Sequence, residues 1–132
     1  MNNISVKKIL DMCSELDGRK ERITFLKNNM NDELRKVFDV VFYDDIEFRD
    51  IDWGSYMNVC KCDEESVSLV YVLNRIKIFS NDADSNDEKM KKLFGQYTEM
   101  LLKDDAEILV KILSKDLKEY GITKKMIEKC LE

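Results

Sequence analysis

Hydrophobic residues recur at intervals of three and four positions along most of this 132-residue chain, with polar residues between them. That spacing gathers hydrophobic side chains on one face of an α-helix, which then packs against a core. The helices that it predicts are 4–16, 19–30, a third from Asn31 to Phe42, 64–79, 86–102, 105–119 and a last one after Thr123. The chain has no proline and only four glycines, although sheet proteins need frequent turns of these residues. The pattern therefore predicts a single domain over residues 1–132 with an all-α fold, a compact bundle of about six to seven helices without a sheet.

Two of the predicted helices begin with pairs of residues that can satisfy free backbone N–H groups. Ser85 with Glu88, and Asp104 with Glu107, have the three-residue spacing of a capping box. Residues 80–87 are rich in Ser, Asn and Asp, which is typical of a turn. We therefore expect a linker over 80–87, followed by the fifth and sixth helices.

The segment 44–62 lacks helical spacing and is acidic, so it predicts a long loop with one short helical turn. Its aromatic residues Phe48, Trp53 and Tyr56 are expected to pack the loop against the core. The next segment, 64–79, has a regular helical face. The residues of that face are Leu69, Val72, Leu73, Ile76 and Phe79.

The formal charge of −5 is unevenly distributed along the chain. Residues 1–36 have a net charge of +2, residues 37–70 of −7, and residues 71–132 of zero. An acidic total speaks against indiscriminate nucleic-acid binding, which depends on neutralising phosphates, but it permits a local basic face. No apolar run approaches the roughly 18 residues that would span a bilayer, and the N-terminus is not a signal peptide. We expect a cytoplasmic protein that does not engage a membrane.

The chain lacks the residues from which most catalytic and metal sites are built. It has no histidine, and neither a P-loop nor a G-x-G-x-x-G motif is present. Its four cysteines, Cys13, Cys60, Cys62 and Cys130, are expected to be free thiols, since the C-x-C pair has no nearby co-ligand. The carboxylates over 82–88 lack the order of a calcium loop. We expect no cofactor, no metal and no small-molecule substrate.

Lysines in the predicted sixth helix form a candidate binding face for phosphate. Lys111, Lys115 and Lys118 lie three to four residues apart, so a continuous helix would place them on one side. Asp116 and Glu119 lie among them, and a solvated face of mixed charge is the alternative interpretation.

The residues that follow predict a corner and an anion site. Gly121 stands where the end of a helix needs a left-handed backbone, and Thr123 can cap the last helix. Lys124 and Lys125 then open that helix, whose free N–H groups and partial positive charge favour an anion. Phosphate contact is the functional interpretation of this corner.

The run 102–129 resembles a signature of ATP-dependent DNA ligases, notably those of large phages. Residues 112–117 match an I-L-x-R-D-L pattern, with Lys115 in place of the arginine. The continuation of the pattern matches Gly121, Ile122, Lys125, Ile127 and Lys129. The N-terminal part is also similar to these ligases, at residues 9–10, 22–26, 31–38 and 42–48.

The resemblance implies the all-helical, N-terminal DNA-binding domain of such a ligase, which grips duplex DNA around a nick through the phosphate backbone. Arg19, Lys20 and Arg22 are then a second candidate DNA-binding cluster. The adenylation domain of that family carries its nucleophilic lysine in K-x-D-G. The nearest string here is 15–18, E-L-D-G, where a carboxylate replaces the lysine, so we expect no catalysis by this chain.

Two acidic segments depart from the family pattern. Residues 79–84 read F-S-N-D-A-D where such ligases often carry T-G-N, and residues 39–65 are strongly acidic. Carboxylates near DNA would repel it. Either the DNA-binding face lies elsewhere, or the same scaffold has become a stand-alone interaction or inhibitor protein that binds a basic partner such as a nuclease or polymerase. An enzyme with an unrecognised site is the least favoured alternative.

Overall fold

A computed structural model describes residues 5–58 and 67–131, and in these ranges the chain forms seven α-helices without a β-sheet. The all-α prediction is therefore confirmed. The helices are α1 (Val6–Ser14), α2 (Arg19–Asn28), α3 (Asp32–Phe38), α4 (Leu69–Leu73), α5 (Asp87–Met100), α6 (Lys103–Ser114) and α7 (Lys124–Cys130). Four shorter turns join them: a π-helical turn η1 (Asp39–Tyr43) and the 3₁₀ turns η2 (Trp53–Tyr56), η3 (Ile76–Phe79) and η4 (Lys118–Tyr120).

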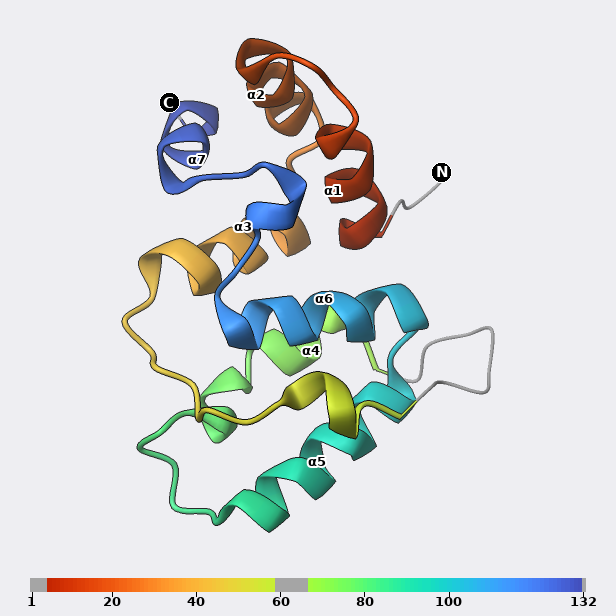
Figure 1. Cartoon of the computed structure of the whole chain (residues 1–132), viewed down its shortest axis with the longest axis vertical. Coiled ribbons are helices and arrows are strands. Elements are labelled where there is room, and N and C mark those ends of the chain that lie inside the picture. The colour runs from red at the N-terminus through yellow and green to blue at the C-terminus, as the bar shows by residue number, and fades with distance from the viewer. Residues whose placement is uncertain (1–4, 59–66, 132) are drawn as a thin grey trace.

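Helix α6 lies at the centre of the arrangement (Figure 1). It packs against α1 on one side and against α5 and η2 on the other, while α2 and α7 lie side by side at one end of the molecule. Ile108, Leu109 and Ile112 of α6 are completely buried, as the helical pattern requires for a central element. No helix in the described ranges is long and apolar enough to cross a membrane.

Side-chain caps begin several helices, but not all at the predicted residues. Thr123 Oγ1 accepts from the N–H of Met126, which confirms the predicted cap of α7. Both predicted capping boxes are wrong. Asn86, one residue later than Ser85, caps α5. Asp104 lies inside the first turn of α6, where it accepts a hydrogen bond from Ser5 Oγ at 3.0 Å and so ties α1 to α6.

The predicted third and fourth helices have the right buried faces but change conformation along their length. Helix α3 begins after Asn31 as expected, then widens into η1, which buries Val40 as well as Val41. The segment predicted as one helix over 64–79 is α4 followed by η3, and its residues 64–66 lie outside the described ranges. The break at Asn74 and Arg75 lets the last turn swing Phe79 against Trp53, with ring centroids 5.3 Å apart.

The acidic loop is attached to the rest of the fold by the apolar Trp53 and the charged Arg49. Trp53 is buried between Phe79 and Phe94, and η2 is the predicted short helical turn. The Arg49 guanidinium donates to the carbonyls of Asn81, Ala83 and Ser85 and pairs with Asp87 at 3.1 Å. Phe48 is half-buried, whereas Tyr56 is exposed, so the prediction that all three aromatics pack inward is wrong for Tyr56.

The predicted sixth helix over 105–119 is too long, because α6 ends at Ser114. Lys115 adopts a left-handed backbone with φ of 51°, and its N–H and that of Asp116 bond to the last turn of α6 in a Schellman-type ending. The Asp116 carboxylate then accepts from the N–H of Lys118, and such a local bond competes with helix continuation. Gly121 has the predicted left-handed backbone, with φ of 71°, but it follows the 3₁₀ turn η4 rather than an α-helix.

Candidate nucleic-acid interface

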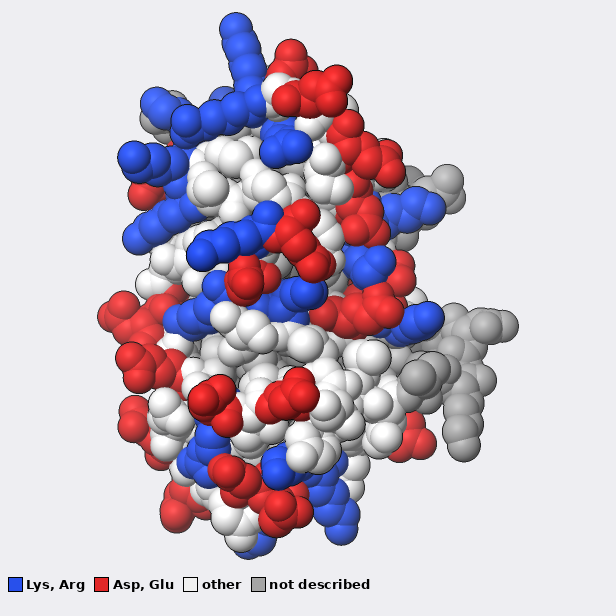
Figure 2. All heavy atoms as spheres, in the orientation of Figure 1, with Lys and Arg blue, Asp and Glu red and all other residues white. Residues whose placement is uncertain are grey.

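Helices α2 and α7 present a shared basic surface, which we call the α2/α7 surface and define by the exposed residues of these two helices. Figure 2 shows Lys and Arg gathered at the upper end of the molecule, where Figure 1 places α2 and α7. The exposed basic residues are Arg19, Lys20, Lys27, Lys124, Lys125 and Lys129. With half-buried Arg22, the two helices contain seven basic and two acidic residues, a net charge of +5 in a chain whose total is −5.

The sequence folds into this surface because each helix buries its apolar residues on the other side. In α7, Met126, Ile127 and Cys130 are buried, whereas Lys124, Lys125 and Lys129 are exposed to solvent. The buried thiol of Cys130 donates to the carbonyl of Ile23 in α2, with a sulfur–oxygen distance of 3.6 Å. Burial raises the pKa of this thiol, so it stays protonated as a donor. Buried residues thus hold α2 and α7 together, and the charged residues of both helices, except half-buried Arg22, face solvent.

Most charges of the α2/α7 surface have no opposite charge close by. Among the described residues, Arg19, Lys20, Lys27 and Lys125 form no ion pair within 4.0 Å. The Lys124 ammonium lies 5.3 Å from the centroid of the Tyr43 ring, a cation–π distance. Their positive potential is therefore available to an anionic ligand.

The lysines predicted on one face of the sixth helix do not form a common surface. Lys111 pairs with Glu119 at 2.9 Å, and the Lys115 ammonium donates to the carbonyl of Asp44 at 2.8 Å. Lys118 is exposed, but it lies in η4, beyond the end of α6. The prediction of one continuous lysine face is wrong because it required a helix through residue 119.

Three other predicted residues organise the corner before α7. The Arg22 guanidinium donates to the carbonyls of Leu16 (2.9 Å) and Ser14 (3.3 Å) and lies directly over Gly121. Thr123 caps α7. Arg22, Gly121 and Thr123 thus hold α1, α2 and α7 together, while Arg19 and Lys20 remain exposed beside them.

The carboxylates of the two acidic segments gather in a different part of the molecule. In Figure 2 they follow the left side of the lower half, below the α2/α7 surface. Asp44, Asp45, Glu47 and Asp82 line a cavity of about 720 Å³ there. The two acidic segments that depart from the ligase pattern therefore meet in space at this cavity.

Sequence reasoning missed Lys27 and Lys129 as members of the basic surface. Lys20 and Lys27 are seven residues apart, and Lys125 and Lys129 four apart, so each pair shares a helix face. The spacing within each pair could be seen in the sequence. The packing of α2 against α7, which brings the two pairs together, could not be inferred from it.

Comparison with known proteins leaves the chain without an assigned family. No protein-family model matches it, and no curated protein is significantly similar to it.

Proposed function

We propose that this chain is a non-catalytic DNA-binding domain that engages the phosphate backbone of duplex DNA through the α2/α7 surface. The observation that supports the proposal is a concentration of basic residues, net +5, at one end of a chain whose total charge is −5. The resemblance to DNA ligases supports a duplex with a nick as the preferred form.

Phosphates rather than base edges are the expected contacts. Five exposed residues of the surface, Arg19, Lys20, Lys27, Lys124 and Lys125, have side chains long enough to follow a charged backbone. Phosphate contacts position a protein on DNA without reading its sequence. If all five engage, the logarithm of affinity should fall with the logarithm of salt concentration with a slope of about 4 to 5. The carboxylates elsewhere should orient the molecule with its acidic side away from DNA.

A binding titration with charge-reversed variants tests the proposal. Reversal of Lys124 and Lys125 to glutamate should weaken binding to all DNA sequences alike, by about thirtyfold if each contact contributes about 1 kcal/mol. It should also lower the salt slope by roughly 1.8. The matched control reverses Lys77 and Lys103, which are exposed outside α2 and α7 and carry the same total charge.

The titration is run near 0.15 M salt, where charges further apart than about 8 Å are largely screened. The control variant should then lose less than about threefold. Equal losses in the two variants would show that net charge alone governs binding, and absence of binding even at low salt would refute the DNA proposal. Comparison of nicked with continuous duplex tests the preference implied by the ligase resemblance.

A second candidate function is recognition of a basic protein, in which the chain would act as an interaction or inhibitor protein. The observation that favours it is the acidic cavity lined by Asp44, Asp45, Glu47 and Asp82. Replacement of Asp45 and Asp82 by lysine should abolish binding of an arginine-rich peptide, while the Lys124 and Lys125 reversal should not. If DNA fails to bind and this peptide binds with the stated pattern, the second function replaces the first.

A further inference from the structure

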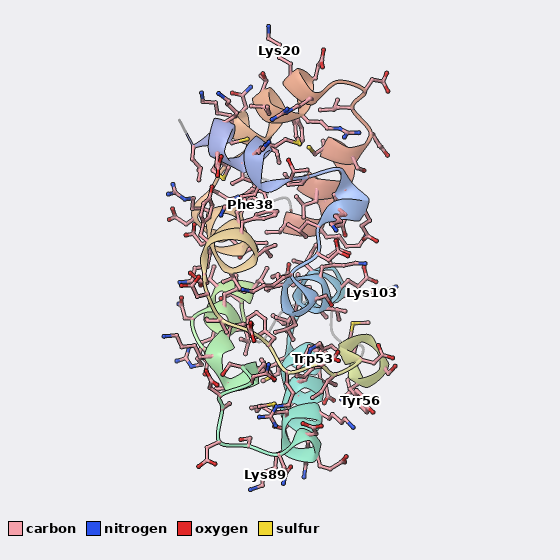
Figure 3. The ribbon with its side chains drawn as sticks, turned by 60° about the vertical axis from the view of Figure 1, so that its left-hand side comes forward. Lys20, Phe38, Trp53, Tyr56, Lys89 and Lys103 are labelled. Carbon is pink, nitrogen blue, oxygen red and sulfur yellow. The ribbon has the colours of Figure 1, made fainter. Side chains whose placement is uncertain are left out.

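A second, separate cleft lies between η2 with its following residues and helix α5. Its volume is about 700 Å³, within the range of small-ligand sites. Its lining includes Tyr56, Asn58, Lys91, Lys92, Gly95 and Gln96. Figure 3 places Tyr56 in the half of the molecule opposite Lys20 of the α2/α7 surface.

The cleft exists because the chain after η2 can lie directly on α5. Gly95 is buried at the contact, and a Cβ there would come within 2.8 Å of Asn58 Nδ2 and 3.3 Å of the Tyr56 carbonyl. Asn58 donates from its side chain to the Gly95 carbonyl (3.1 Å) and from its backbone to Thr98 Oγ1 (2.9 Å). The wall that carries Tyr56 is therefore held in place before any ligand arrives.

The groups that line the cleft combine an exposed ring, two cations and an amide. The Tyr56 side chain is 38% exposed, with the Lys91 ammonium 4.8 Å from its ring centroid. Lys92 is exposed and forms no ion pair within the described ranges. Gln96 adds an exposed side-chain amide that can both donate and accept. Glu88 at the rim pairs with Lys91 at 3.5 Å, which leaves Lys92 as the principal anion contact.

We propose that this cleft binds a nucleotide unit, with the base stacked on Tyr56 and its phosphate held by Lys92. An aromatic face beside basic side chains is the usual arrangement for binding unpaired bases, because every base has a flat face and every nucleotide a negative charge. The same chemistry is offered by a free nucleotide and by single-stranded DNA. The site does not depend on the proposed duplex-binding function, since it shares no residue with the α2/α7 surface.

The buried Trp53 in the same 3₁₀ turn as Tyr56 provides a local fluorescence reporter, and it is the only tryptophan of the chain. Thymidine 5′-monophosphate and an eight-residue oligothymidine are titrated separately, with excitation beyond the absorption of thymine. Saturable binding of either probe is expected. Tyr56→Leu should weaken it about five- to 150-fold, the range found when a stacking residue is removed. Tyr56→Phe keeps the ring and should retain binding, and Lys92→Gln should weaken it.

The outcomes separate the two sources of the ligand and the two proposals. Binding of the mononucleotide assigns a nucleotide site, and binding of the oligonucleotide alone assigns a single-strand site. The Lys124 and Lys125 reversal should leave mononucleotide binding unchanged, and Lys103→Gln is the exposed control for Lys92. Circular dichroism and thermal unfolding establish that each variant is folded. Absence of saturable binding of both probes at low salt, or equal affinity of the wild type and Tyr56→Leu, would overturn the proposal.

Discussion

Substitution of Gly121 by alanine should destabilise the fold measurably, because two separate costs meet at this residue. Its φ of 71° is in the left-handed region, where an L-residue costs roughly 1–2 kcal/mol. The new Cβ would also collide with Nη1 of Arg22. That guanidinium is held by hydrogen bonds to Leu16 and Ser14, so its displacement should add about 1–2 kcal/mol.

The expected loss of unfolding free energy is therefore about 2–4 kcal/mol in total. For a domain of this size each kcal/mol corresponds to roughly 3–4 °C in melting temperature, so the melting temperature should fall by about 6–16 °C. Urea unfolding gives the free energy directly. Gly54 is the matched control. A Cβ added there would make an ordinary van der Waals contact with Val110 Cγ1 at 3.9 Å, and the alanine variant should change stability by less than about 1 kcal/mol.

A double-mutant cycle separates the two costs. In an Arg22→Met background the guanidinium is absent, so Gly121→Ala should retain only the backbone cost of about 1–2 kcal/mol. A loss below about 0.5 kcal/mol for the single Gly121 variant would refute the reasoning about both the backbone and the guanidinium. An unchanged cost in the Arg22→Met background would refute the part that concerns Arg22.

Three further properties should follow from the packing. Arg49→Met should lower the free energy of unfolding in urea by about 1–2 kcal/mol, because several linker carbonyls lose a charged donor. Arg75→Met, at an exposed site, should lower it by less than about 0.5 kcal/mol, and equal losses would contradict this role of Arg49. Burial, with the neighbouring Glu119 carboxylate, raises the pKa of Tyr120 to about 12. The unfolded chain therefore loses this proton at a lower pH than the folded chain, and the free energy of unfolding should fall as pH rises from about 10 to 12. Tyr120→Phe should flatten that fall in unfolding curves measured across this range, and an identical slope would show that the buried hydroxyl does not cause it. Burial also raises the pKa of the Cys13 and Cys130 thiols. In a variant with Cys60 and Cys62 replaced by serine, a thiol reagent should therefore react slowly with the native protein and fully after unfolding. Rapid reaction of the native protein would contradict the burial of the two thiols.

The cysteines illustrate how far local sequence reasoning reached. Cys13 and Cys130 are buried free thiols, while the expectation for Cys60 and Cys62 falls on residues outside the described ranges. The bond from the Cys130 thiol to the Ile23 carbonyl of α2 could not be inferred, because it joins residues 107 positions apart in sequence.

The sequence by itself determined the fold class, most helix positions and the buried faces. These depend on spacing within one turn of helix and on capping by residues three positions away, so the information is local. Gly121 and Thr123 were predicted correctly for this reason. The predicted face of 64–79 is likewise buried throughout, even though the helix there is interrupted.

Only the tertiary structure decided which basic residues share one surface. Lys115 is drawn to the acidic loop through the Asp44 carbonyl, 71 positions away in sequence, and the helix ends before Lys118 can join it. Lys27 and Lys124 belong to one surface because α2 and α7 pack against each other. Burying apolar faces sets the distances between exposed charges on different helices, and no periodicity within either helix encodes that distance.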